Sequence, residues 1–168
     1  VSQPYAGGTP VWTTYSYDGI GRTLSTTASD GSATTYSYVG NTVTVTDAAG
    51  KWKKYTMDAF GNVKQVDEPG SLVTTYAYDV LGHLTNVWMP RNGYTQTRTF
   101  NYTVGANVGA LLLSATNPET GTMTYTYNSD NTLASKHDAK GQVFTYAYDG
   151  YKRVQTVSVG GSLLRSYI

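Results

Sequence analysis

The chain has 168 residues, enough for one domain with a core, and its net charge of +1 with only 14% charged residues gives no electrostatic basis for binding nucleic acid or an anionic membrane. It contains no cysteine, so disulfides cannot hold the fold, and no apolar run approaches the ~20 residues of a membrane-spanning helix. Tyrosine is unusually frequent, with 16 copies, and these tyrosines organise the chain.

A pair of aromatic residues separated by one residue recurs along the chain. The first members of successive pairs are 21, 19, 21, 24, 25, 21 and 21 residues apart. Such self-similarity is typical of a repeat architecture, and we expect about seven repeats over residues 13–168 after a lead-in at residues 1–12. Because Tyr167 opens a further unit, we expect a piece excised from a longer array. The first slot of the pair holds Tyr15, Tyr36, Tyr55, Tyr76, Phe100, Tyr125 and Tyr146, and the second slot holds Tyr17, Tyr38, Met57, Tyr78, Tyr102, Tyr127 and Tyr148.

Two turn signals divide each repeat into two strands. In the first turn, an aspartate follows the aromatic pair and a glycine stands three residues later. The aspartate can bond back to the turn amides, and the glycine supplies a positive φ angle at little cost. The second signal is a glycine-containing pair near the end of the repeat, such as Asp30-Gly31. The first turn is marked by Asp18 and Gly21, Asp58 and Gly61, Asp79 and Gly82, and Asp149, with Asn131 and Lys152 in the glycine slot of the sixth and seventh repeats.

Departures from the 21-residue step have local causes. The second repeat carries Gly40-Asn41 in place of the four-residue turn, which predicts a two-residue hairpin loop and accounts for its step of 19. Residues 91–97 are expected to lengthen the second loop of the fourth repeat. Residues 105–109 are expected to lengthen the first loop of the fifth.

The resulting fold class is all-β. Apolar and small polar residues alternate with period two, and threonine and tyrosine favour strands. We expect roughly fourteen strands of ~6 residues in one continuous antiparallel hairpin meander. Because an open twisted sheet rarely exceeds ~10 strands without curling, this sheet is expected to coil into a partial shell or superhelix, with same-slot tyrosines stacking across strands.

The repeated segments resemble the Rhs, or YD-repeat, motif: aromatic-x-aromatic-Asp-x-x-Gly, then Arg or Asn and an apolar residue. The segments at 15–22, 55–63 and 76–84 carry it most fully, and the repeats cover about nine-tenths of the chain. The resemblance implies a large secreted or cell-surface polyprotein whose repeats coil into a β-shell. In bacterial Rhs toxins and Tc toxin complexes the shell encloses a toxic C-terminal domain. In teneurins a similar shell belongs to an adhesion ectodomain, and some such repeats are described as carbohydrate-binding.

We therefore expect a structural segment of a shell wall rather than an enzyme, with no cofactor and no metal. The autocleaving Asp-Pro-x-Gly-Leu motif of full Rhs shells is absent from the sequence, so neither self-cleavage nor toxicity is expected of this chain. Expected partners are the remainder of a larger Rhs-type polypeptide or its cargo, and further copies through exposed edge strands. The alternative function is a glycan- or protein-binding adhesion module that uses exposed aromatic side chains.

Other candidate sites have a structural interpretation beside the functional one. His83 and His137 lack metal-binding spacing and are expected at exposed hairpin positions. The recurring turn aspartates resemble a calcium ladder, but one carboxylate per turn does not supply the ~6–8 oxygen ligands that calcium takes, so turn capping is favoured.

Trp12 and Trp52 are the candidate ligand platform. Each lies three residues before the first tyrosine of its repeat, so each is expected to face away from the tyrosine stripe. Exposed aromatic rings can stack on sugars, whereas packing against a neighbouring element is the structural alternative. The one basic cluster is interpreted as a solvated sheet edge that discourages pairing, with polyanion binding as the alternative. It consists of Lys51, Lys53, Lys54 and Lys64.

Overall fold

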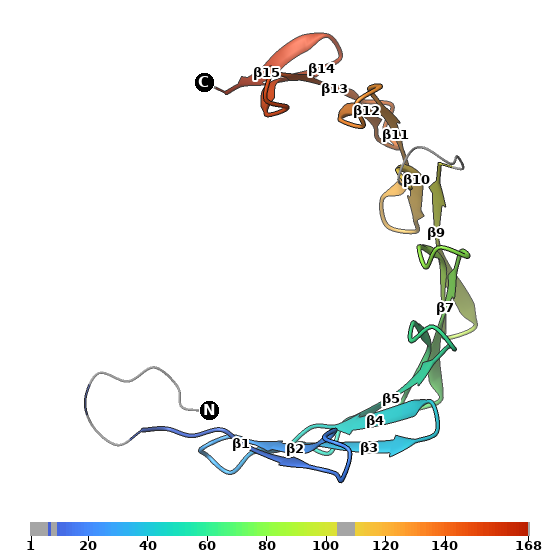
Figure 1. Ribbon diagram of the computed structural model, residues 1–168. Coiled ribbons are helices and arrows are strands. Elements are labelled where there is room, and N and C mark those ends of the chain that lie inside the picture. The colour runs from blue at the N-terminus through green and yellow to red at the C-terminus, as the bar shows by residue number, and fades with distance from the viewer. Residues whose placement is uncertain (1–6, 8–9, 104–109, 168) are drawn as a thin grey trace. The chain divides into compact units, whose positions relative to one another are not determined.

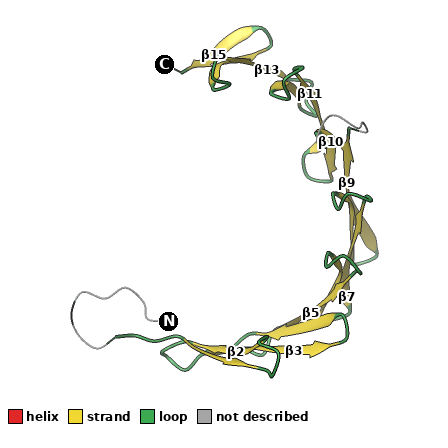
Figure 2. Ribbon diagram, viewed as in Figure 1, coloured by secondary structure: helices red, strands yellow, loops and turns green. Residues whose placement is uncertain are grey.

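The strands follow one another in the sheet in the same order as in the sequence. The computed structural model describes residues 7, 10–103 and 110–167. These contain fifteen strands in one sheet, ordered β1 to β15 without a crossover (Figure 1). Figure 2 shows only strands and connecting loops in the described residues. The predicted all-β antiparallel meander is confirmed, with one strand more than expected, while its coiling into a partial shell or superhelix stays a prediction.

The strands are short, and each repeat contributes two of them. Most of the predicted lead-in, residues 1–12, lies outside the described residues. The strands are β1 (Thr14–Tyr17), β2 (Thr23–Thr27), β3 (Ala33–Val39), β4 (Thr42–Thr46), β5 (Trp52–Met57), β6 (Val63–Glu68), β7 (Leu72–Tyr78), β8 (Leu84–Arg91), β9 (Tyr94–Tyr102), β10 (Leu112–Asn117), β11 (Gly121–Tyr127), β12 (Leu133–His137), β13 (Val143–Tyr148), β14 (Val154–Val159) and β15 (Ser162–Ser166).

Two compact units make up the chain, one comprising Val1–Thr75 with Met89–Arg91 and the other Tyr76–Trp88 with Asn92–Ile168. In the first unit, antiparallel pairing runs without interruption from β1 through β7. In the second unit it runs from β9 through β15. Each strand therefore pairs with its neighbours in sequence, as expected for a chain of hairpins.

The predicted turns form where the aspartate and glycine signals stand. Gly21, Gly61 and Gly82 have φ angles of 85°, 87° and 84°. Asn131 and Lys152, which replace the glycine, also have positive φ angles of 67° and 62°. Asparagine tolerates this conformation, whereas lysine does so at a cost in strain. The Lys152 ammonium lies 3.4 Å from the Asp130 carboxylate of the preceding repeat, which supports this residue in its place.

The loop lengths follow the sequence in one place and depart from it in another. Val39 pairs directly with Thr42, so Gly40-Asn41 forms the predicted two-residue hairpin loop. The prediction of a long loop at residues 91–97 is wrong, because β8 extends to Arg91 and β9 begins at Tyr94. The extra residues lengthen the strands instead, and Asn92 and Gly93, both with positive φ, make the tight turn between them. The predicted loop at residues 105–109 lies outside the described residues.

A β-bulge precedes the second aromatic slot in several repeats. The register shifts between Ser16 and Tyr17 on β1, so that Leu24 on β2 is an extra, unpaired residue. The same shift occurs on β5, β11 and β13, just before Met57, Tyr127 and Tyr148. It is absent between β3 and β4, where the two-residue loop replaces the four-residue turn. The bulge therefore belongs to the long turn, and it twists the strand as it enters that turn.

The sheet has two chemically different faces and little core. In β11 and β13 the tyrosines are half-buried, whereas Thr124, Thr126 and Thr145 on the opposite face are exposed. Hydroxyl pairs join neighbouring strands on that exposed face, as between Thr126 and Ser135 at 2.7 Å. In the part of the chain that the structure describes, no second layer packs on either face of the sheet, so the core expected from the chain length is small. The buried residues of the described chain are Val66, Thr74, Val87 and Ala115, each of which keeps a small exposed fraction.

Candidate functional site

The aspartate of the first turn organises a compact hydrogen-bond network. In the first repeat, Asp18 Oδ1 accepts hydrogen bonds from the backbone N–H groups of Ile20 at 3.0 Å and Arg22 at 2.9 Å, and its Oδ2 accepts one from Arg22 Nε at 2.6 Å. These bonds stabilise the charged carboxylate and lower the pKa of Asp18 below its ordinary value, the Arg22 side chain contributing most. The same pattern recurs at Asp58, Asp79 and Asp149. The turn-capping interpretation of these aspartates is therefore confirmed.

The second turn of some repeats is built in the same way, which the sequence pattern did not reveal. Asp47 Oδ1 accepts hydrogen bonds from the backbone N–H groups of Ala49 and Lys51 at 2.9 and 2.8 Å. Asp138 does the same for Lys140 and Gln142. An aspartate three residues before the glycines of Ala49-Gly50 and Lys140-Gly141 was the available signal.

In several repeats the second aromatic slot holds the repeat against the one before it. The hydroxyl of the tyrosine in this slot donates a hydrogen bond to the backbone carbonyl of the residue that opens the second strand of the preceding repeat. We call this contact the tyrosine clamp. It joins Tyr38 to Thr23 at 3.0 Å, Tyr102 to Leu84 at 3.1 Å, Tyr127 to Leu112 at 2.9 Å and Tyr148 to Leu133 at 2.9 Å.

The tyrosine clamp replaces the cross-strand ring stacking predicted from the sequence. Same-slot tyrosines lie on alternate strands, about 9–10 Å apart, which is beyond the 4.5–7 Å of aromatic contact. The stacked tyrosines in the described chain are instead Tyr15 and Tyr17 on one strand, with ring centroids 6.4 Å apart. Burial, with a smaller effect of Tyr125, raises the pKa of the clamped Tyr127 hydroxyl above its ordinary value. The first-slot tyrosines Tyr36, Tyr55, Tyr76, Tyr125 and Tyr146 are half-buried.

The residue after the turn glycine supports the ring of the clamping tyrosine. The Arg22 guanidinium carbon lies 4.4 Å from the centre of the Tyr38 ring, a cation–π contact. His83 occupies the same slot, with its ring 5.1 Å from that of Tyr102 and its Nδ1 2.8 Å from Asp79 Oδ2. The prediction of an exposed His83 is therefore wrong, because the tyrosine of the next repeat covers it. His137 is exposed, as predicted.

The third repeat shows how the junction changes when the tyrosine is missing. Met57 fills its second aromatic slot and has no hydroxyl. The preceding repeat carries the short Gly40-Asn41 loop, and the Asn41 side-chain amide donates to the Met57 carbonyl at 2.6 Å. The Met57 N–H in turn donates to the Asn41 carbonyl at 2.9 Å. Two changes in neighbouring repeats thus compensate one another.

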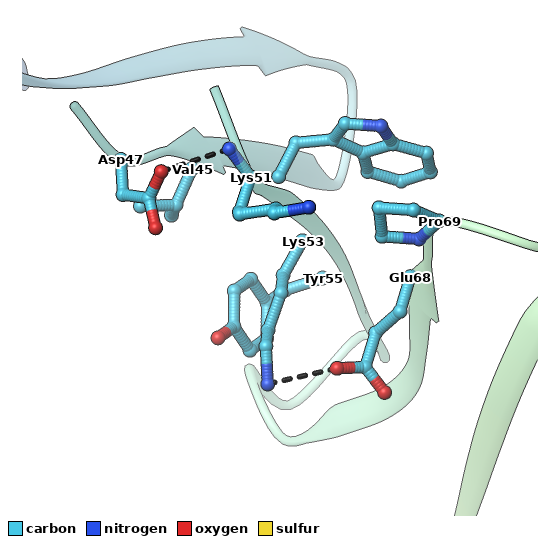
Figure 3. A pocket seen from close by; sticks show the side chains of 8 residues that line it. Val45, Asp47, Lys51, Lys53, Tyr55, Glu68 and Pro69 are labelled. Atoms are coloured by element: carbon cyan, nitrogen blue, oxygen red, sulfur yellow. Dashed lines mark hydrogen bonds and ion pairs between the residues drawn. The ribbon is translucent and has the colours of Figure 1, made fainter. Parts of the chain in front are cut away.

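Trp52 lines an open hollow of about 320 Å³ in the first unit. This volume is at the lower end of the range of small-molecule sites. Trp52 is 37% exposed, and Trp12, which precedes β1, is 56% exposed. Although Trp52 was expected to face away from the tyrosine stripe, it lines the same hollow as Tyr55. The remaining lining residues are Val45, Asp47, Lys51, Lys53, Glu68 and Pro69 (Figure 3).

The lysines near this hollow are not at a sheet edge. The strand β5 lies between β4 and β6, so the interpretation of the cluster as an edge that discourages pairing is wrong. Lys53 instead pairs with Glu68 at 2.9 Å, and Lys54 lies 3.6 Å from Asp67 (Figure 3 shows the first pair). The acidic partners reduce the positive field that a polyanion would meet.

Among residues 7, 10–103 and 110–167, no group of three or more His, Asp or Glu side chains could hold a metal ion. In the same residues, no helix is long and apolar enough to cross a membrane.

Residues 58–87, from the first turn of the third repeat to the fourth repeat, match the family model of the RHS Repeat. This stretch of the chain is an Rhs repeat. The Rhs/YD-repeat resemblance noted from the sequence is thereby confirmed. No curated protein matches the sequence.

The fold of this chain matches segments of much longer proteins in solved structures. The chain is 18% identical in sequence to a chain of the Photorhabdus luminescens Tc holotoxin pore, with a TM-score of 0.69, covering 88% of this chain and 9% of that one. It is 17% identical to a chain of the TcdB2-TccC3 crystal structure, with a TM-score of 0.72, covering 92% of this chain and 10% of that one. It is also 17% identical to a chain of the TcdB2-TccC3-Cdc42 crystal structure, with a TM-score of 0.71, covering 96% of this chain and 10% of that one. The chain thus spans about a tenth of the length of these proteins and shares their local fold.

Proposed function

We propose that this Rhs-repeat chain forms part of the wall of a larger polypeptide, where it scaffolds or encloses another domain. The observation that carries the proposal is the tyrosine clamp, which ties a repeat to the repeat just before it and so suits an array of any length. The match to about a tenth of the TcdB2-TccC3 chain supports a larger parent. Secretion or display at the cell surface, and enclosure of a toxic cargo, are parts of the proposal that rest on the family.

A wall segment has exposed edges wherever its neighbours are absent. Within the described residues, the strands β1 and β15 pair on one side only, and every residue of both is exposed. Unpaired edges of this kind invite strand-to-strand association. We therefore expect copies of this chain to associate reversibly through these edges.

Analytical ultracentrifugation over a range of concentrations tests the exposed edge. Leu163→Lys places a charge on the edge strand β15, whereas Leu113→Lys places one on the interior strand β10, and both leucines are exposed. Association should weaken in the first variant and persist in the second. A parent chain that stays monomeric at high concentration would contradict the edge model.

The hollow at Trp52 favours a second candidate function, recognition of a glycan or of another protein. An exposed indole and a phenol beside paired charges are groups that sugar-binding sites use. A glycan-array screen with Trp52→Ala, and Trp12→Ala as the matched control, tests this candidate. Binding lost only in Trp52→Ala would place a ligand in the hollow, whereas a blank array with folded protein favours the wall.

A further inference from the structure

The tyrosine clamp has a fixed construction that can be compared along the chain. The acceptor is the carbonyl of the first residue of an even-numbered strand, as at Thr23 of β2 and Leu133 of β12. The donor follows 15 residues later in three of the clamps, those of Tyr38, Tyr127 and Tyr148. The turn before the acceptor supplies the residue on which the ring rests, such as Arg22 under Tyr38.

The last turn has the same construction on the acceptor side. Val154 opens β14, and Arg153 precedes it as Arg22 precedes Thr23. Arg153 Nε donates to Asp149 Oδ2 at 2.7 Å, as Arg22 Nε does to Asp18 at 2.6 Å. The two arginines are therefore held by the same bond to their turn aspartates.

What covers the two arginines differs. The Arg22 side chain is 45% exposed beneath the Tyr38 ring. The Arg153 guanidinium carbon lies 5.3 Å from the centre of the Tyr151 ring in its own turn, yet the Arg153 side chain is still 75% exposed. An open pocket of about 430 Å³ lies over the Arg153 turn. It is lined by Asp149, Arg153, Val154, Gln155 and Tyr167.

We propose that this pocket is a binding site for the phenol side chain of a tyrosine carried by a peptide strand that continues β15. The ring would rest on the Arg153 guanidinium, and its hydroxyl would donate to the Val154 carbonyl. The 15-residue offset places this tyrosine directly after Ile168, two positions beyond Tyr167, which is the spacing of the aromatic pair. The inference needs only the repeat geometry and does not depend on what the wall encloses.

The turn also indicates which side chain the site takes. The junction that accepts methionine, at Met57, follows a two-residue loop and is held by the Asn41 amide. The last turn is instead the four-residue Asp149 turn with a cationic support, the form that accepts Tyr38 in the first junction. Tyr17 shows the reverse case: it lies on the edge strand β1, with no preceding even-numbered strand in the sheet, and is 58% exposed.

Appending residues after Ile168 tests the site without altering any existing residue. One tyrosine, one phenylalanine or one alanine is added, and a fourth variant adds alanine followed by tyrosine. Because successive strand residues face opposite ways, the fourth variant carries the same phenol on the wrong face. Amide hydrogen exchange of β14 and β15 is then compared with that of the parent chain.

The single tyrosine should slow exchange in β15 about fivefold, which corresponds to one net hydrogen bond of ~1 kcal/mol. Phenylalanine should give a smaller effect, and alanine and alanine-tyrosine almost none. The effect of the appended tyrosine should also shrink when Arg153→Ala is introduced, with circular dichroism checking that the chain remains folded. Equal protection from tyrosine, alanine and alanine-tyrosine, or an effect that Arg153→Ala leaves undiminished, would overturn the proposal.

Discussion

Removing a single hydroxyl should loosen the junction between two repeats. The Tyr127 hydroxyl donates to the Leu112 carbonyl at 2.9 Å in a half-buried position. Tyr127→Phe keeps the ring but removes this bond, and a neutral hydrogen bond contributes ~1 kcal/mol, within a range of about 0.5–1.5 kcal/mol. With a urea dependence of roughly 2 kcal/mol per molar, the unfolding midpoint should fall by about 0.5 M.

Urea unfolding of Tyr127→Phe beside a matched control measures this contribution. Tyr17→Phe makes the same chemical change on β1, where the ring is exposed, and should alter the free energy of unfolding by less than ~0.5 kcal/mol. Hydrogen exchange should show the loss at β10 and β11 rather than across the chain, since each repeat contacts only its neighbours. Equal effects of the two substitutions would refute the clamp as a source of stability.

Three further predictions concern the turns. Asp58→Ala removes three turn hydrogen bonds and should lower the free energy of unfolding in a urea titration. Asp30→Ala, which removes the bond from the Ser32 N–H, should lower it less. Gly82→Ala, at φ 84°, should cost ~1–2 kcal/mol in the same assay, whereas Gly19→Ala, at a negative φ with open space around its Cβ, should cost almost nothing. The turn aspartates have pKa values below the ordinary 3.8 in the folded chain. Their contribution to the free energy of unfolding is therefore present above about pH 4 and should be lost as the pH falls through the folded pKa values. Urea midpoints that stay the same between pH 7 and pH 2 would contradict this prediction.

Local chemistry explains how far the sequence could predict this fold. Aspartate and glycine at fixed offsets determine turns through their own bonds and φ angles, so the turns at Asp18 and Gly40 could be predicted. The extra length at residues 91–97 could not be assigned from the sequence. Two longer strands joined by a tight Asn92-Gly93 turn use the same number of residues as two shorter strands joined by a long loop. The strand-like composition of that segment favoured the strands.

The candidate site was less predictable for a different physical reason. The partner of the Tyr38 hydroxyl is the Thr23 carbonyl, and a backbone acceptor leaves no side-chain signature in the sequence. The bulge at Leu24 is likewise a matter of register between two strands. The hollow beside Trp52 is also lined by Glu68 and Pro69, which come from the following strand and turn. The repeat period of the sequence did not predict that these two residues lie next to Trp52.

The order of the strands also has a consequence for how the chain acquires its structure. Every strand pairs with the strands that come just before and after it in the sequence. The chain segment that must close to form each pairing is therefore short, and the entropy lost on closure is small. We therefore expect this chain to fold faster than a β-sandwich of similar size. We also expect its hairpins to form one after another from the N-terminus during synthesis.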